Sequence, residues 1–258
     1  MYFEIIKGLL LPFLGTALGA ACVLFIKKDL KANIKSAISG FAGGVMIAAS
    51  IWSLIIPAME YESVLKFGRL RFFPAVCGLW VGIIFMIVLE RLVPEVDFLS
   101  KKSQSFGESK MLLFSVALHN LPEGMAVGVA YASFLSSKSP LALSGAFALS
   151  LGIAIQNFPE GAIISLPLAS EGMSKPKAFL YGILSGIIEP IGAAITILAL
   201  SFVLPILPFL LSFAAGAMIY AVIKELLPVI YLEKSSNLGV LFFSAGFSFM
   251  MILDVAFG

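Results

Sequence analysis

The sequence predicts an all-α integral membrane protein with eight transmembrane helices in a single polytopic domain, residues 1–258. Three observations support this fold class. Hydrophobic residues make up 60% of the chain and charged residues only 12%, whereas soluble domains carry about 25% charged residues. The mean hydropathy is +1.06. The apolar residues form runs of the roughly 20 residues that a helix needs to cross a bilayer, without the alternation of barrel strands. A soluble enzyme, a disordered chain and a nucleic-acid-binding protein are excluded.

Polar segments separate the predicted spans in order. The first apolar run is longer than the 7–15 residues of a signal-peptide core, so we expect it to be retained as a helix. Polar breaks follow at residues 27–35, 60–69, 94–110, 136–139, 170–176 and 233–237, and Pro205 and Pro208 mark the boundary between the sixth and seventh spans. The predicted spans are 4–26, 36–59, 70–93, 111–134, 140–168, 177–200, 203–227 and 238–257.

The distribution of basic residues predicts the orientation. In the eight-span arrangement, twelve of the 17 lysines and arginines fall on one side of the membrane and five on the other. Basic residues collect on the cytoplasmic side. We therefore expect a multi-pass protein of the cell membrane (inner or plasma membrane), with the 94–110 loop in the cytoplasm and both termini outside.

Three glutamates, Glu123, Glu160 and Glu189, lie deep inside apolar spans. A carboxylate at the bilayer centre costs about 2.5–3.5 kcal/mol on insertion scales, so each needs a partner, a proton or a metal. The first two belong to HNLPEG (119–124) and QNFPEG (156–161), which share the pattern Asn-x-Pro-Glu-Gly on consecutive spans. A chance duplication of this pattern is hard to credit in so apolar a chain.

The spacing within each motif brings polar side chains together. The first motif residue lies four positions before the glutamate on the same helix face, and the asparagine lies three positions before it on an adjoining face. These residues are His119, Asn120 and Glu123 on the fourth span, and Gln156, Asn157 and Glu160 on the fifth. Pro122 and Pro159 are expected to kink both helices, and the following glycines permit close approach. The pattern indicates a cation site between two helices, or two adjacent sites bridged by carboxylates.

The donor set indicates a labile divalent metal. With Glu189 from the sixth span, it comprises three carboxylates, one imidazole and three amides, which suit zinc, manganese or ferrous iron. A permanent structural zinc site more often uses thiolates. Amide hydrogen bonds also join membrane helices, but packing does not require three buried carboxylates.

These residues resemble the ZIP family of divalent-metal transporters over essentially the whole chain. HNLPEG is similar to that family's central motif and QNFPEG to its counterpart on the fifth span. The order of eight spans and the glutamate on the sixth span also fit. Two further stretches, Gly40–Pro57 and Phe213–Tyr220, resemble the GufA-like prokaryotic branch.

The resemblance implies a ZIP-type bundle with a binuclear metal centre halfway along the pathway. One site would be formed by His119, Glu123, Gln156 and Glu160, and the other by Asn120, Asn157, Glu160 and Glu189, with Glu123 able to bridge them. The resemblance also implies a homodimer, in which spans 1, 4, 5 and 6 move as a unit against spans 2, 3, 7 and 8.

The chain also departs from the family pattern. Many members carry a second histidine where this chain has Gln156, and some have aspartate where Asn157 stands, so we expect weaker metal binding at the second site. His119 is the only histidine, and the long histidine-rich cytoplasmic loop of many eukaryotic members is absent.

The resemblance also places candidate pathway residues away from the centre. Met46, Ser53, Met218 and Asp254 would line the outer pathway. Glu225 would be an exit ligand, although Lys224 beside it would repel a cation, and the alternative interpretation is an interfacial charge pair. Glu90 is interpreted as an ordinary solvated charge.

The leading functional interpretation is transport of divalent metal toward the cytoplasm. Zinc is the favoured substrate, and ferrous iron, manganese and cadmium are the other candidates. Elevator-type alternating access is the favoured mechanism, because discontinuous helices with a midplane site are typical of it, and a channel-like path is the alternative. No nucleotide-binding motif is present, so no ATP step is expected, and neither is a prosthetic group. The expected partners are divalent ions, the lipid bilayer and a second copy of the chain.

Two other function classes remain as alternatives. An intramembrane metal-dependent hydrolase would use a glutamate to activate a metal-bound water, but the chain has a single histidine and no HExxH motif. A non-transporting membrane scaffold would use the polar cluster for helix packing alone.

Overall fold

The computed structural model describes residues 2–25, 31–61, 68–92, 106–135, 143–170, 172–199, 202, 204–231 and 237–257. Within these ranges it describes all side chains except those of residues 2, 92, 106–119, 163, 167, 170, 204, 225 and 257.

Every regular element in the described ranges is a helix. The first half of the chain contains α1 (Tyr2–Phe25), α2 (Ala32–Ala49), the π-helix η1 (Ser50–Ile55), α3 (Ile56–Glu60), the 3-10 helix η2 (Gly68–Leu70), α5 (Phe72–Leu92) and α6 (Phe106–Leu135). The second half contains α7 (Leu143–Ser170), α8 (Lys175–Gly186), α9 (Ile188–Leu198), the 3-10 helix η3 (Leu204–Ile206), α11 (Leu207–Ala221), the π-helix η4 (Val222–Leu226), α12 (Leu227–Ile230) and α13 (Leu238–Phe257).

Seven helical segments of the described chain are long and apolar enough to cross a membrane. They are Phe3–Phe25, Ala32–Glu60, Gly68–Arg91, Leu143–Leu166, Lys175–Leu198, Leu207–Ile230 and Leu238–Ala256. An all-helical membrane protein is therefore confirmed. The predicted fourth span falls on α6, a helix of 30 residues that carries the first polar motif and is not one of these seven. Eight spans remain a prediction.

Prolines affect the helices in two different ways. α6 and α7 continue as helix through Pro122 and Pro159, so the kinks there remain a prediction. The sequence did not predict the π-helices η1 and η4, which end two residues before Pro57 and Pro228. Proline lacks the N–H that would bond to the carbonyl four residues earlier, and the wider π turn falls where that bond is missing.

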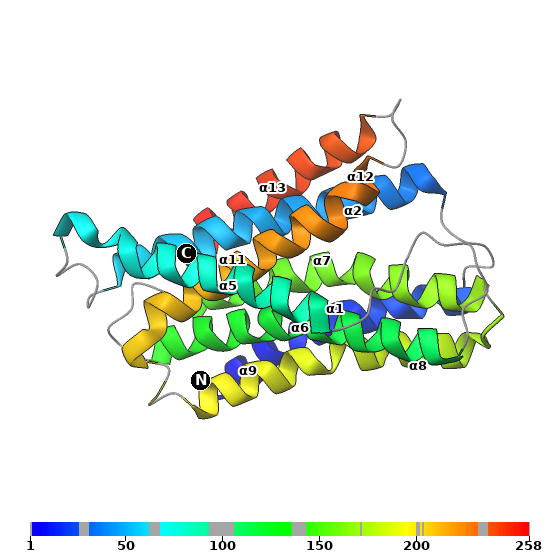
Figure 1. The fold of residues 1–258 in the computed structure, drawn as a ribbon, viewed down its shortest axis with the longest axis horizontal. Helices are drawn as coiled ribbons and strands as arrows, with labels where there is room; N and C mark the ends of the chain where they lie inside the picture. Colours follow the sequence, from blue (N-terminus) through cyan, green and yellow to red (C-terminus); the bar gives the residue numbers. More distant parts are fainter. Residues whose placement is uncertain are drawn as a thin grey trace.

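The helices pack in two groups. One group contains α1, α6, α7, α8 and α9, and the other contains α2, α5, α11, α12 and α13. Figure 1 shows α2, α11, α12 and α13 along one side of the bundle and α1, α6, α7, α8 and α9 along the other. Along the long axis of the bundle, both ends of the chain lie in the same half (Figure 1).

Glycines determine how closely helices approach within each group. A Cβ built on Gly161 of α7 would lie 2.0 Å from the backbone oxygen of Thr16 in α1. One built on Gly44 of α2 would lie 2.0 Å from the backbone oxygen of Phe243 in α13. These pairs pack backbone against backbone, which only small residues permit.

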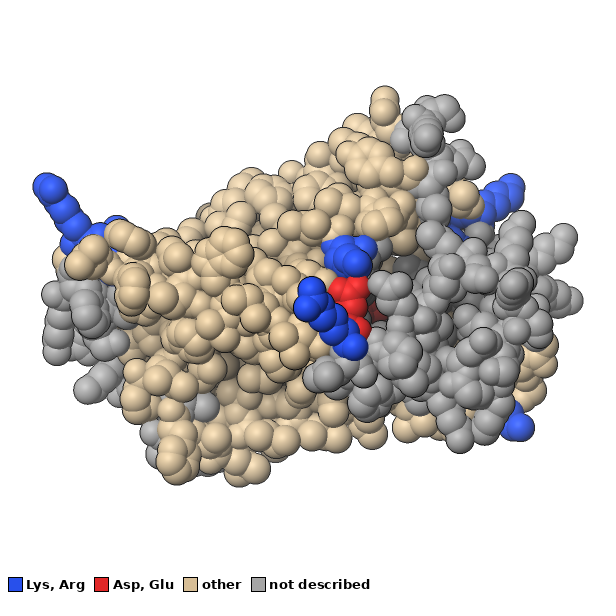
Figure 2. All heavy atoms as spheres, in the orientation of Figure 1, with Lys and Arg blue, Asp and Glu red and all other residues tan. Residues whose placement is uncertain are grey.

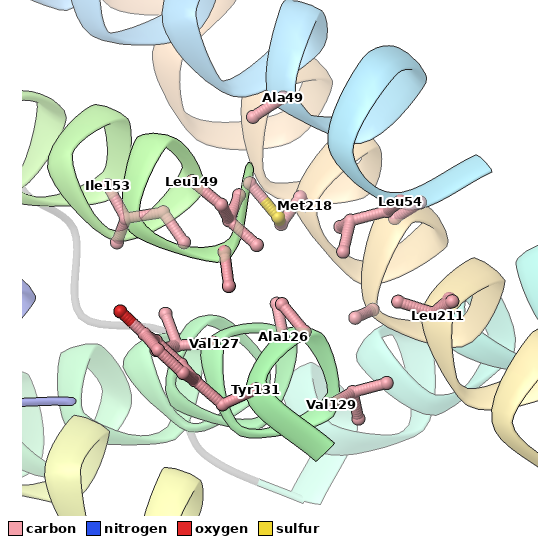
Figure 3. Packing of buried hydrophobic residues seen from close by; sticks show 14 of the residues in the cluster. Ala49, Leu54, Ala126, Val127, Val129, Tyr131, Leu149, Ile153, Leu211 and Met218 are labelled. Carbon is pink, nitrogen blue, oxygen red and sulfur yellow. The ribbon is translucent and has the colours of Figure 1, made fainter. Parts of the chain in front are cut away.

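Side chains fill the interface between the two groups. Gly152 of α7 faces the flexible side chain of Met250 from α13, whose sulfur would lie 2.3 Å from a built Cβ. Figure 3 shows Met218 of α11 beside Leu149 of α7, with Ala126 of α6 nearby. At these positions of the described chain, the interface is made by apolar side chains.

The outer surface is apolar over long stretches. Large exposed hydrophobic side chains line α1, α5, α9 and α13, including Leu18, Trp80, Ile195 and Ile252. The face in Figure 2 is mostly uncharged between its two ends, apart from one cluster of basic and acidic residues. Such a surface suits contact with lipid.

Candidate metal centre

Glu189 accepts three hydrogen bonds at the candidate centre. It lies in the first turn of α9, directly after the break in the helix at Ile187, and its side chain is only 1% exposed. Its Oε1 accepts hydrogen bonds from the Thr16 hydroxyl at 3.0 Å and the Asn120 amide at 3.1 Å. Its Oε2 accepts one from the Asn157 amide at 2.8 Å. Glu189 thus joins α9 to α1, α6 and α7.

The two motif asparagines therefore converge on one carboxylate. Asn120 and Asn157 are both buried, and each directs its NH₂ group at Glu189. The Asn120 amide also donates to the backbone oxygen of Ser185 at 3.1 Å, which ties α6 to α8. Buried polar groups need such hydrogen-bond partners.

A second amide–carboxylate pair adjoins the first. Gln156 Nε2 donates to Glu123 Oε1 at 2.8 Å and to Asn157 Oδ1 at 3.3 Å. The side chains of Glu123 and Gln156 are 4% and 0% exposed. Gln156 Oε1 is buried and accepts no hydrogen bond from the described residues. Through Gln156 and Asn157, the network runs without interruption from Glu123 to Glu189.

Glu160 and His119 complete the predicted ligand set. Glu160 is half-buried in α7. The backbone of His119 lies in α6 next to Asn120, but its side chain is outside the described residues. Among the described side chains, no three His, Cys, Asp or Glu residues are grouped closely enough to hold a metal ion. The described carboxylates are instead connected through amides.

Glycines hold the helices together at this centre. A Cβ built on Gly124 would lie 2.2 Å from the backbone oxygen of Glu189. This contact brings the HNLPEG segment of α6 against the residue that carries the third carboxylate. Gly161, which follows Glu160, makes the corresponding contact with α1. Gly124 thus sets the distance between two helices that carry candidate ligands, and Gly161 sets the distance between α7 and α1.

The structure brings two of the candidate outer-pathway residues into direct contact. Ser53 of η1 donates a hydrogen bond to Asp254 Oδ1 of α13 at 2.5 Å. The other Asp254 oxygen is buried and has no hydrogen-bond partner in the described part of the chain. Met46 and Met218 are buried in the main hydrophobic cluster.

The charges at the predicted cytoplasmic end differ from the prediction. Lys224 forms a salt bridge with Glu90 Oε1 at 3.0 Å, and the Tyr220 hydroxyl donates a hydrogen bond to Glu90 Oε2. The interpretation of Glu90 as an ordinary solvated charge was wrong, because its side chain is only 23% exposed and ties α5 to α11 and η4. The side chain of Glu225 is outside the described residues.

Sequence reasoning missed Thr16 and Ser185. Thr16 is the only hydroxyl side chain between Gly8 and Phe25 of α1, which was the available signal. Ser185 contributes a backbone oxygen, for which no side-chain pattern exists. Both residues belong to the centre because they contact residues far away in the sequence: Thr16 contacts Glu189, and Ser185 contacts Asn120.

Known proteins resemble this chain along most of its length. The family model described as "ZIP Zinc transporter" matches residues 100–254. The zinc transporter GufA of Myxococcus xanthus is 35% identical over 96% of this chain and 97% of its own length. The zinc transporter ZIP11 of Homo sapiens is 31% identical over 99% and 98%. The zinc transporter ZIPB of Bordetella bronchiseptica is 32% identical over 95% and 79%. The chain belongs to the ZIP zinc transporter family.

Proposed function

We propose that this protein transports zinc, and related divalent metals, toward the cytoplasm through a binuclear centre near the middle of the membrane. The observation that carries the proposal is the buried amide–carboxylate network from Glu123 to Glu189. Intramembrane ionisable residues usually mark an ion pathway. The named relatives are zinc transporters, which supports zinc as the substrate.

The proposed ligands are the residues that the two motifs and the sixth span supply. The first metal would be bound by His119, Glu123, Gln156 and Glu160, and the second by Asn120, Asn157, Glu160 and Glu189. A carboxamide nitrogen that donates has no lone pair for a metal, so the amides can bind only through oxygen. The oxygen of Gln156 accepts no hydrogen bond from the described residues, whereas the oxygen of Asn157 accepts one from Gln156. A metal at the Asn157 oxygen would therefore displace the Gln156 amide.

The two helix groups support elevator-type movement. The group of α1, α6, α7, α8 and α9 carries every proposed ligand, and glycine contacts hold it together. Its contact with the other group is made by side chains such as Met250 and Met218. Rigid groups with a side-chain interface can slide, as alternating access requires. No ATP step is proposed.

We place the protein in the cell membrane with eight spans and both termini outside. The position of both chain ends in one half of the bundle supports an even number of crossings. The 30-residue α6, packed against α7, α9 and α11, would be the additional span. We further propose a homodimer, consistent with the ZIP family.

The test is uptake of radioactive zinc into sealed proteoliposomes. Wild type is compared with Glu160→Gln and with Glu4→Gln as a matched control, since Glu4 is an exposed acid paired with Lys7 in α1. We expect saturable uptake by wild type and the control and its loss in Glu160→Gln at equal amounts of folded protein. No uptake of zinc, iron or manganese by wild type would favour the scaffold or hydrolase alternatives.

A further inference from the structure

We propose that Thr16 of α1 determines the metal preference of the centre by occupying one oxygen of Glu189, so that Glu189 binds metal through its other oxygen alone. This inference rests on the proposed function and adds a specificity residue that lies outside both motifs. Thr16 acts through Glu189 and is therefore a positioning residue.

The hydrogen bonds around Glu189 leave little room for a metal. Each carboxylate oxygen offers about two lone pairs. Oε1 receives two donors, the hydroxyl of Thr16 and the amide of Asn120. Oε2 receives one donor, the amide of Asn157. A metal that approaches this arrangement finds one free lone pair, on Oε2, and Glu189 acts as a monodentate ligand. Turning the Asn157 amide frees Oε2 further and leaves Oε1 occupied.

Packing keeps the Thr16 hydroxyl in place. Thr16 is fully buried and lies between two glycines of neighbouring helices. A Cβ built on Gly186 of α8 would lie 2.8 Å from Thr16 Cβ and 3.1 Å from Thr16 Oγ1. Gly161 of α7 contacts the Thr16 backbone. Since Gly186 directly precedes the break before α9, the hydroxyl and the start of α9 are held together.

The hydrogen bond of Thr16 differs from the usual bond of a helical threonine. Threonine inside a helix commonly donates to the carbonyl four residues earlier. Thr196 of α9 does so, with a bond of 2.8 Å to the Gly192 oxygen. Thr16 instead crosses to a residue 173 positions away in the sequence. This bond directs the Thr16 hydroxyl at the carboxylate of Glu189. Thr196, whose hydroxyl bonds within its own helix, is therefore a suitable control residue.

A monodentate carboxylate favours a small ion. Zinc is usually four-coordinate, with oxygen ligands at about 2.0–2.2 Å. Larger ions take more oxygens and accept both oxygens of one carboxylate, as calcium does at about 2.3–2.6 Å. Cadmium is larger than zinc. Removal of the Thr16 hydroxyl frees a lone pair on Oε1 and allows Glu189 to bind through both oxygens, which favours cadmium over zinc.

The experiment measures zinc and cadmium uptake by the full-length protein in proteoliposomes. Thr16→Val removes the hydroxyl and keeps the branched shape, Thr16→Ser retains the hydroxyl, and Thr196→Val is the matched control. We expect Thr16→Val to raise the half-saturation concentration for zinc at least about fivefold, and to raise the cadmium-to-zinc rate ratio. Thr16→Ser and Thr196→Val should keep the wild-type ratio. If Thr16→Val does not fold, Thr16→Ala, which also lacks the hydroxyl, should shift the ratio in the same direction.

Two results would overturn the inference. One is an unchanged cadmium-to-zinc ratio in folded Thr16→Val or Thr16→Ala. The other is an equal loss for both metals that Thr16→Ser does not rescue, which would assign Thr16 to packing alone. If wild type takes up no metal, the proposed function fails separately. Equilibrium competition of cadmium against zinc on the purified protein then decides the role of Thr16, with the same expected shift.

Discussion

At the scale of single residues, amide side chains donate hydrogen bonds to the buried carboxylates of the centre. Glu123 and Glu189 lie almost fully buried in a chain that must span lipid, where an unpartnered carboxylate is expensive. Gln156, Asn120 and Asn157 supply donors from neighbouring helices. In the proposed function, the oxygens of the same side chains bind the metal. The proposal therefore describes a site that exists both without metal and with it.

Gln156→His should tighten zinc binding. An imidazole is a better ligand for zinc than an amide oxygen, and its N–H can still donate to Glu123 in place of Gln156 Nε2. We expect the half-saturation concentration for zinc to fall about tenfold, which corresponds to about 1.4 kcal/mol, and the maximal rate to fall because release is slower. Uptake as a function of zinc concentration measures both. Gln156→Ala is the control, with a raised half-saturation concentration. An unchanged value in Gln156→His would remove Gln156 from the ligand set.

Glu189→Gln should destabilise the protein as well as impair uptake. Three donors converge on Glu189, and glutamine offers one acceptor oxygen and an NH₂ group that meets a donor. An unsatisfied buried polar group costs about 1–3 kcal/mol, so we expect a loss of that size in the free energy of unfolding, measured in detergent. Glu4→Gln, at an exposed site, should change it by less than about 0.5 kcal/mol. Equal stability of both variants would contradict the role of Glu189 in joining four helices.

The sequence predicts the buried carboxylates better than their hydrogen-bond partners, for a physical reason. Carboxylates in apolar spans are conspicuous because they are costly there, so Glu123 and Glu189 were visible without a structure. Thr16 was not, because a helical threonine can satisfy its own hydroxyl, as Thr196 does. Glu90 was misread because a charge near a span end is usually solvated, and its partner Lys224 is far away in the sequence.

At the scale of elements, the two π-helices occupy corresponding places. Ser53 in η1 and Lys224 in η4 each lie four residues before a proline, and each contacts a carboxylate on another helix of the same group. Ser53 contacts Asp254 and Lys224 contacts Glu90. Proline in the sequence predicts a disturbed helix, but not whether the disturbance is a kink, a break or a π turn. These two turns aim one polar side chain each toward a neighbouring helix.

Two glycines of α7 should respond differently to alanine. In Gly161→Ala, the new Cβ meets the backbone of Thr16 at 2.0 Å, which cannot move without α1. In Gly152→Ala, it meets the Met250 sulfur at 2.3 Å, at the end of a flexible side chain. Overpacking costs about 1–3 kcal/mol or more where the neighbours cannot yield. We expect Gly161→Ala to lower the free energy of unfolding by at least about 2 kcal/mol and Gly152→Ala by less than about 1 kcal/mol. Thermal unfolding in detergent compares them, and equal losses would contradict the difference between the two kinds of interface.

At the scale of the whole molecule, the helices divide into two groups, which are the two moving parts of the proposed elevator. Hydropathy placed apolar spans along the chain, but the packing partners of each span are set by contacts between residues far apart in sequence. Gly44 with Phe243 and Gly161 with Thr16 are examples. The outcome is that all proposed ligands belong to one group, and the pathway candidates Met46, Ser53, Met218 and Asp254 belong to the other. Movement of one group past the other would therefore carry the metal relative to the pathway residues.

A covalent link between the groups should stop transport, whereas a link inside one group should not. Two glycine–valine contacts of nearly equal geometry allow the comparison. A Cβ built on Gly152 of α7 would lie 3.6 Å from Val45 Cγ1 of α2, across the groups, and one built on Gly43 of α2 would lie 3.5 Å from Val222 Cγ1 of η4, inside one group.

Each pair is changed to cysteines in a background in which Cys22 and Cys77 are replaced by serine, and zinc uptake is measured before oxidation, after oxidation and after reduction. We expect oxidation to abolish uptake in the Val45–Gly152 pair and reduction to restore it, with little change in the Gly43–Val222 pair, because only the first link prevents relative movement. Full uptake through a completely cross-linked Val45–Gly152 pair would rule out the elevator and favour a fixed, channel-like path.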